Sequence, residues 1–235
     1  MTERLSIAGG IGLNLHPSAT NADAGGYTAI LLFATLKDIL MFARLRTIAA
    51  GTALAASLIT APAFAADSYK FDPSHAQILF SYDHIGFSTT YGLFSGFTGT
   101  ATIDKDNLAN SSVQLEMKAT DMFTGWEARE GHFMSADFFN AAENPLVTFT
   151  STKVEPTGEN TAKITGNLTM AGQSKEIVLD AKLNKIGKNP INQKDWAGFN
   201  ATTTLKRSDF GVGKFAPAVS DEVNVVISVE LEKTS

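Results

Sequence analysis

Hydrophobic and polar residues alternate with a period of two along most of the chain from Tyr69 onward. The runs of alternation cover residues 78–82, 113–117, 147–150, 164–168, 177–183, 197–205 and 223–231. Successive side chains of a β-strand point to opposite faces of a sheet, so each run predicts a strand with one buried and one wet face. This pattern is typical of antiparallel sheets, and we expect about eight such strands.

Residues that favour turns separate these runs, at positions 104–107, 156–158, 171–173 and 187–190. Short connections of this kind predict hairpins between strands that are neighbours in sequence. An antiparallel sheet of this size hides its edges either in a sandwich or in a closed barrel, and the alternation alone does not distinguish the two.

Two features of the sequence favour the barrel. Two runs are long, at about ten residues each, and cover positions 91–103 and 196–206. Small residues also occupy inward positions, where they leave room for a ligand inside a barrel of about eight strands. These small residues are Gly99, Ala101, Gly166, Ala181, Ala197 and Ala201. The predicted fold is therefore all-β, an extended antiparallel barrel of about eight strands, with one short helix within residues 125–140, where the alternation stops.

An export signal is predicted inside the chain, at residues 41–65. Two arginines supply a cationic segment, an uncharged apolar segment follows at residues 47–60, and Ala63-Phe64-Ala65 matches the small-x-small motif that signal peptidases require. We therefore expect cleavage between Ala65 and Ala66. The alternative interpretation of the apolar segment is a buried, alanine-rich helix.

The position of this signal also suggests where translation begins. A signal peptide normally occupies the extreme N-terminus, so Met41 is the expected start, and residues 1–40 are interpreted as a non-native N-terminal extension translated from upstream sequence. The alternative is a genuine cytoplasmic extension on an uncleaved anchor. With cleavage, residues 66–235 form one mature domain, located in the periplasm or secreted.

Composition excludes several classes of chemistry. The absence of cysteine rules out disulfide scaffolds, cysteine-ligated zinc, iron–sulfur clusters and thiol nucleophiles. The net charge of −5 argues against nucleic acid as a partner. Residues 66–235 hold 15 basic and 21 acidic residues, so the expected mature net charge of −6 disfavours docking on anionic membrane surfaces. His75, His84 and His132 show no metal-binding spacing, and no serine lies in a G-x-S-x-G context. We therefore expect no enzyme, no metal site and no cofactor.

Apolar residues on the inward phase are the remaining candidates for a site. They predict a cavity with flat apolar walls and few polar groups, which suits a long hydrocarbon ligand. The candidate ligand-binding residues are Ile78, Phe80, Tyr82, Phe97, Leu115, Phe133, Phe138, Phe149, Leu168 and Phe199. The alternative is that these side chains fill an ordinary packed core.

Two arginines are candidates for contact with a charged head group, because a guanidinium binds phosphate oxygens through two parallel hydrogen bonds. They are Arg129 and Arg207. The alternative is a solvated or salt-bridged role. Arg207 and Asp209 are two positions apart, so on a strand they share a face and pair with each other.

Four ordered blocks resemble the YceI-like lipid/polyisoprenoid-binding family over residues 66–235. They are FDPSHAQILFSYDHIGFSTTYGLFSGFTGT at 71–100, EAREGHFMSADFFNAAENPLVTFTSTKVE at 127–155, GNLTMAGQSKEIVLD at 166–180 and GFNATTTLKRSDFGVG at 198–213. The resemblance implies a lipocalin-like barrel with a short helix over it, in the periplasm or secreted. It also implies a long apolar ligand, such as a polyprenyl phosphate, a quinone tail or a fatty amide, and a homodimer.

The function predicted from these observations is non-catalytic binding, storage or transport of an isoprenoid or lipid chain inside the barrel. Two alternatives remain open. The first is an accessory protein that presents a quinone to an inner-membrane redox partner. The second is a stress-response structural protein with a packed barrel.

Overall fold

The computed structural model describes residues 66–235 of the chain. The predicted extension at 1–40 and the predicted signal peptide at 41–65 lie outside the described residues. The strands are β1 (Asp67–His84), β2 (Ser88–Ser95), β3 (Thr98–Ile103), β4 (Ser112–Lys118), β5 (Met122–Phe123), β6 (Leu146–Gly158), β7 (Thr161–Met170), β8 (Gln173–Lys188), β9 (Asp195–Lys206) and β10 (Glu222–Lys233). The helices are α1 (Glu127–Met134) and the 3-10 turns η1 (Leu108–Asn110), η2 (Ala119–Asp121) and η3 (Arg207–Phe210).

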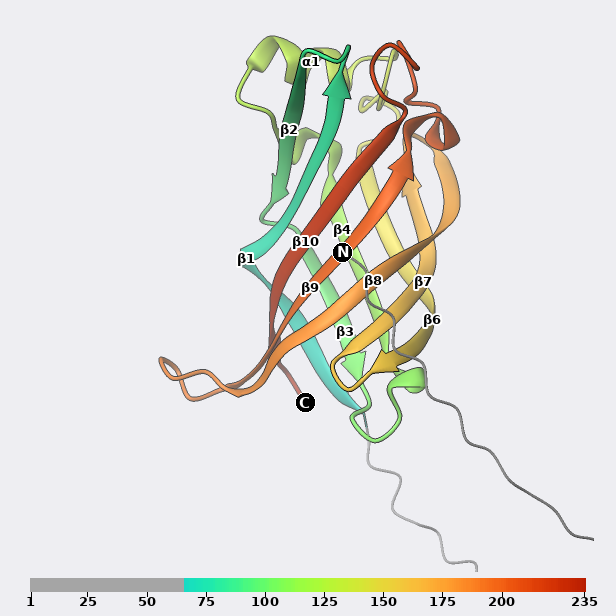
Figure 1. Cartoon of the computed structure of the whole chain (residues 1–235). Helices are drawn as coiled ribbons and strands as arrows, with labels where there is room; N and C mark the ends of the chain where they lie inside the picture. The colour runs from blue at the N-terminus through green and yellow to red at the C-terminus, as the bar shows by residue number, and fades with distance from the viewer. Residues whose placement is uncertain (1–65) are drawn as a thin grey trace, which may run out of the picture. The chain divides into compact units, whose positions relative to one another are not determined.

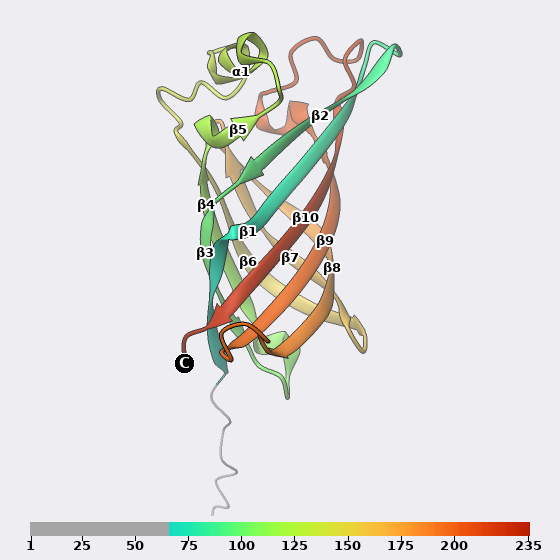
Figure 2. The same ribbon diagram turned by 90° about the vertical axis from the view of Figure 1, so that its left-hand side faces the viewer.

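Eight of these strands close into an antiparallel barrel, in the order β1-β3-β4-β6-β7-β8-β9-β10, with β10 pairing back onto β1 (Figures 1 and 2). The predicted fold class, an extended antiparallel barrel of about eight strands with one short helix, is confirmed. Closure leaves no long unpaired edge in the ring, which is the physical advantage of a barrel over an open sheet. Backbone hydrogen bonds between Ser68 and the C-terminal Ser235 tie the two ends of the barrel sequence together.

One predicted strand is wrong. The run at 91–103 was expected to form a single strand, but it forms β2 and β3, which both pair with β1 at different heights. Gly96 lies at the break with φ +73°, a left-handed conformation that glycine adopts readily and other residues rarely adopt. The second long run, at 196–206, forms β9 as expected.

The two ends of the barrel differ. The end called here the α1 end carries α1, the β1–β2 turn and the loop at 211–221, whereas the far end carries η1 and the β6–β7 and β8–β9 connections (Figure 1). The α1-end loops are joined to each other: the backbone N–H of Ser220 donates to the carbonyl of Asp83 at 3.0 Å, and His84 forms a β-bridge with Val219. The end of β1 and the 211–221 loop are therefore connected.

Inward side chains of all eight barrel strands form the core. Two of the inward glycines do not leave empty space as expected, because an aromatic ring from a neighbouring strand lies over each. A Cβ at Gly99 would come within 2.7 Å of the Phe71 ring, and one at Gly166 within 2.5 Å of the Phe149 ring. The absence of a side chain at each glycine therefore allows a large ring to pack inside the barrel, and the positions of these rings determine where empty space remains in the interior.

Candidate functional site

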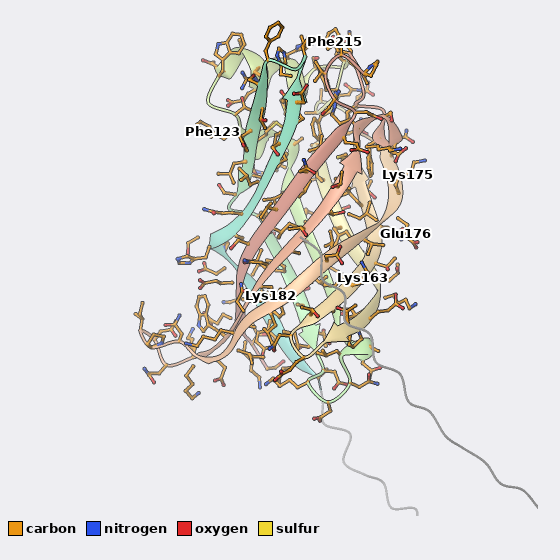
Figure 3. The ribbon with its side chains drawn as sticks, viewed as in Figure 1. Phe123, Lys163, Lys175, Glu176, Lys182 and Phe215 are labelled. Carbon is orange, nitrogen blue, oxygen red and sulfur yellow. The ribbon has the colours of Figure 1, made fainter. Side chains whose placement is uncertain are left out.

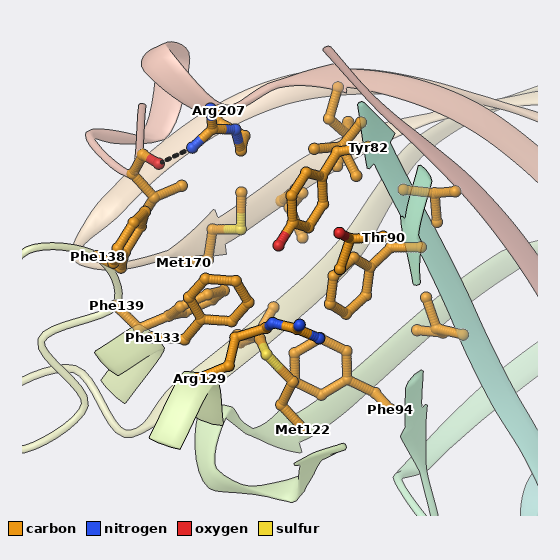
Figure 4. Close-up of a pocket in the computed structure, with 18 of the residues that line it drawn as sticks. Tyr82, Thr90, Phe94, Met122, Arg129, Phe133, Phe138, Phe139, Met170 and Arg207 are labelled. Atoms are coloured by element: carbon orange, nitrogen blue, oxygen red, sulfur yellow. Dashed lines mark hydrogen bonds between the residues drawn. The ribbon is translucent and has the colours of Figure 1, made fainter. Parts of the chain in front are cut away.

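An apolar cavity of about 510 Å³ occupies the barrel at the α1 end (Figure 4). Inward residues of β1, β2, β4, β6, β7, β8, β9 and β10 form its walls, and residues of α1 and the 211–221 loop surround its opening. Its lining includes the exposed side chains of Trp126 and Phe215, so the cavity reaches the surface there. A volume of this size accommodates a drug-sized ligand.

A second apolar cavity, of about 410 Å³, occupies the far half of the barrel. Four residues line both cavities and therefore stand between them: Leu115, Phe149, Leu179 and Ile227. Phe149 is 3% exposed, and its ring rests on Gly166 in the next strand. The barrel thus contains two apolar chambers in series, separated by a short waist at which Phe149 contributes the largest side chain.

The structure brings together nine of the ten predicted cavity residues. The α1-end cavity is lined by Ile78, Phe80, Tyr82, Leu115, Phe133, Phe138, Phe149 and Leu168, and the far-end cavity is lined by Phe199 with Leu115 and Phe149. Phe97 is a correction, since it lines neither cavity. It is 2% exposed, and its ring packs 5.9 Å from that of Phe71, so it is part of the packed core.

Several lining residues were not predicted. They are Phe94, Met117, Met122, Trp126, Met170 and Phe215. Met117 and Phe94 are on the inward phase of β4 and β2, so the alternation contained the signal for both. Trp126 and Phe215 are in loops, where periodicity carries no information. Methionine is flexible and fits irregular apolar surfaces, which suits a wall that adapts to its contents.

An aromatic cluster connects α1 to the cavity. Phe133 of α1 lies 6.5 Å from Tyr82 and 5.2 Å from Phe138, measured between ring centroids, and Phe138 lies 6.3 Å from Phe215. The carboxylate of Glu130 accepts hydrogen bonds from the Thr124 backbone N–H at 2.6 Å and from the Thr124 hydroxyl at 3.2 Å, which hold the approach to the helix. These hydrogen bonds lower the pKa of Glu130. The helix is thus fixed over the opening by apolar contacts below and by the hydrogen bonds of Glu130 to Thr124 in the segment that precedes it.

Arg129 lines the cavity from α1 and points into it, beside Phe94 and Met122 (Figure 4). Its guanidinium carbon lies 5.5 Å from the centre of the Trp126 ring, and Nη1 donates to the Thr124 carbonyl at 3.3 Å. Among the residues described, no carboxylate forms a salt bridge with it. Arg129 therefore has donors available for an acceptor inside the opening.

Arg207 also lines the cavity, but four of its five N–H donors are already used. Nε donates to the carbonyl of Ser220 at 2.8 Å, and the terminal nitrogens donate to the carbonyls of Val212 at 3.0 Å, Lys214 at 3.2 Å and Val219 at 2.9 Å. Desolvation by burial lowers the pKa of Arg207. The expected pairing with Asp209 is wrong, because Arg207 begins the 3-10 turn η3 rather than continuing a strand. Its guanidinium instead fixes the shape of the 211–221 loop.

Three other titratable groups at the opening, Asp137, Lys214 and His132, contact one another. Asp137 contacts the ammonium of Lys214, and its second carboxylate oxygen lies 3.1 Å from Nε2 of His132. These two hydrogen bonds, that of Lys214 first, lower the pKa of Asp137. Within residues 66–235, no group of three or more acidic or histidine side chains is placed to hold a metal ion, and no helix is long and apolar enough to cross a membrane.

A closed antiparallel barrel with a short helix over an apolar interior defines a lipocalin-like binding barrel. A model of the YceI-like domain family matches residues 69–231, and the chain belongs to this family. A UPF0312 protein of Ectopseudomonas mendocina is 38% identical over 192 residues, which cover 79% of this chain and 97% of that protein. Protein YceI of Escherichia coli O17:K52:H18 is 38% identical over 182 residues, which cover 77% of this chain and 94% of that protein.

Solved structures with the same fold include a YceI protein of Campylobacter jejuni, with a TM-score of 0.59 and 31% identity, covering 65% of this chain and 90% of that one. BcnA of Burkholderia cenocepacia gives a TM-score of 0.62 at 23% identity, covering 68% of this chain and 98% of its own. A polyisoprenoid-binding domain of Saccharophagus degradans, implicated in plant cell wall breakdown, gives 0.54 at 16% identity, covering 71% of this chain and 98% of its own. The last two likenesses concern the fold alone.

Proposed function

We propose that this protein binds one long apolar chain, an isoprenoid or another lipid, along the axis of the barrel, without catalysing a reaction on it. The observation that carries the proposal is the pair of apolar cavities, about 510 and 410 Å³, that follow each other through the interior with shared walls. Each buried CH₂ group contributes about 0.8 kcal/mol, so a chain threaded through both cavities binds tightly even without directional contacts. The name of the S. degradans neighbour, a polyisoprenoid-binding domain, is consistent with this ligand class.

The polar end of the ligand belongs at the α1 end. Arg129 points into the opening and has free N–H donors, whereas Arg207 contributes its positive charge but few free N–H donors. A phosphate, a quinone carbonyl or an amide oxygen at this point accepts hydrogen bonds from Arg129. The role of Arg129 in head-group binding is part of this proposal, and Arg207 is assigned to holding the loop.

The proposed location is the periplasm, reached through cleavage between Ala65 and Ala66. The support is the order of a cationic segment, an apolar segment and a small-x-small motif at residues 41–65. The quinone-presenting accessory remains a second candidate, because a quinone tail fits the same cavities. A packed barrel is disfavoured by the volume of the two cavities.

Extraction tests the proposal. Protein purified from its native compartment is extracted with organic solvent, and the extract is analysed by mass spectrometry and compared with the molar amount of protein. We expect one prenyl or acyl species close to stoichiometric. A protein that yields no such species, and that binds no fluorescent long-chain probe after extraction, contradicts the proposal.

A further inference from the structure

Large apolar side chains are exposed around the opening of the α1-end cavity. Ile85 is 51% exposed, Phe87 89%, Trp126 61% and Phe215 54%. We call these four residues the apolar rim. They come from three separate segments: the β1–β2 turn, the residue before α1 and the 211–221 loop, whose Phe215 lies at the α1 end (Figure 3).

The rim is continuous with the cavity. Trp126 and Phe215 line the cavity directly, and so do His84 and Ser88, the residues on either side of the Ile85–Phe87 tip. An apolar chain leaving the cavity therefore passes rim side chains before it meets bulk water. A surface of this kind allows a lipid to move between the protein interior and another apolar phase without crossing water.

Backbone strain at two rim positions is an independent observation. Ile85 has φ +60° and Gly86 has φ +74°, and the N–H of Phe87 donates to the His84 carbonyl at 3.1 Å, so these residues form a tight turn with two left-handed positions between β1 and β2. Asparagine or glycine suits the Ile85 position far better than a β-branched residue does. Phe215 also has a left-handed φ, +67°, with an exposed ring. Apolar side chains occupy these turn positions although the left-handed backbone conformation costs free energy, which indicates that the side chains have a function there.

From these observations we propose that the apolar rim inserts into the surface of a zwitterionic lipid bilayer, with the cavity opening facing the membrane. Aromatic side chains, tryptophan above all, favour the boundary between lipid head groups and acyl chains. Exposed single side chains on three projecting segments suit insertion between lipids better than contact with a flat protein surface.

Charge at the rim identifies the type of lipid. Two positive groups lie beside the rim, Arg129 against Trp126 and Lys214 against Phe215. Negative groups are close to them, since Asp137 contacts Lys214 and Glu127 follows Trp126 in the first turn of α1. Charges of both signs beside the rim match head groups that carry both signs, while the acidic chain as a whole is repelled by an anionic surface. Attachment is therefore expected to depend on apolar insertion and to change little with salt.

Trp126 is a built-in reporter of docking. The chain has two tryptophans, and the Trp196→Phe variant leaves Trp126 alone. Residues 66–235 close into a barrel with their own core, so the test uses the chain from Ala66. We expect phosphatidylcholine vesicles to shift Trp126 emission to shorter wavelength, and phospholipids brominated on their acyl chains to quench it.

Three variants separate docking from stability. Phe87→Ser is expected to lower the vesicle partition coefficient about ten-fold, because it removes one fully inserted ring. Ile85→Asn is expected to weaken partitioning and also to raise the melting temperature, because asparagine suits the turn. Ile191→Ser is the matched control, since Ile191 is 92% exposed but lies in the β8–β9 connection at the far end, and partitioning should not change.

Three outcomes would overturn the proposal. The first is that both rim variants partition into vesicles as the unchanged protein does, and the second is that the protein binds only phosphatidylglycerol vesicles and loses this binding at high salt. The third is that the rim variants lose self-association in ultracentrifugation and keep vesicle binding. This design measures membrane docking separately from ligand binding. Phe87 and Ile85 line neither cavity, so uptake of a fluorescent fatty probe without vesicles should be unaffected in both variants. Loss of probe binding with intact docking would count against the proposed function and leave the membrane surface standing.

Discussion

Truncation of two buried phenylalanines distinguishes a cavity wall from a packed core. Phe97 and Phe149 are almost equally buried, at 2% and 3% exposed, but only Phe149 faces the cavities. Phe97→Ala opens a new void in tight packing, and we expect a loss of about 3–5 kcal/mol in the free energy of unfolding. Phe149→Ala enlarges space that already exists on both sides of the ring, so fewer packing contacts are lost, and we expect about 2 kcal/mol.

Ligand affinity should respond in the opposite order. Phe149→Ala removes wall contact at the waist, and a loss equivalent to two buried CH₂ groups weakens binding by about ten-fold. Phe97→Ala should leave affinity unchanged, and so should Lys182→Ala, because Lys182 is on the wet face of β8 (Figure 3). Urea denaturation of ligand-free protein measures stability, and titration with a fluorescent long-chain lipid measures affinity. Equal stability losses for both phenylalanines, with no change in binding for either, would refute the assignment of Phe149 to a cavity wall.

Three further predictions follow from the other contacts. Arg207→Lys should lower the free energy of unfolding by about 2–3 kcal/mol in urea denaturation, because lysine leaves several loop carbonyls unpaired. Hydrogen bonds from Ser208 lower the pKa of Asp221 in the folded state. The contribution of Asp221 to stability is therefore present above the usual aspartate pKa and is lost as the pH falls through the lowered pKa. In thermal melts at decreasing acidic pH, the stability difference between the protein and Asp221→Asn should therefore shrink. Replacing Ala63 and Ala65 with bulky residues should leave an unprocessed precursor on immunoblots, and normal processing would contradict the predicted cleavage site.

The alternation of the sequence predicted the strands well because it reports which face of a strand is buried, and the long runs and small inward residues favoured a barrel over a sandwich. It did not predict the break at Gly96, where the glycine has a left-handed φ and the inward phase changes from even positions in β2, such as Phe94, to odd positions in β3, such as Ile103, because alternation alone does not show where one strand ends and the next begins. The same limit applies to the phenylalanines. Phe97 and Phe149 are both inward, but whether an inward ring meets other side chains or empty space depends on strands far away in sequence, such as β7 with Gly166.

The two arginines at the opening show why a candidate site residue is judged by its free donors. From sequence, Arg129 and Arg207 had the same candidate role, and both do line the α1-end cavity. The difference comes from backbone geometry: the 211–221 loop turns four carbonyls toward Arg207, whereas a helix already uses most of its own carbonyls and offers few to Arg129. An arginine on a helix, with few free carbonyls near it, thus keeps its donors for a ligand. If Arg129 binds the head group, Arg129→Gln should weaken binding of a phosphorylated prenyl chain more than binding of the corresponding hydrocarbon. Arg207→Lys should weaken binding of both ligands equally, because it alters the 211–221 loop. Equal effects of Arg129→Gln on the two ligands would show that the charge of Arg129 has no part in recognition.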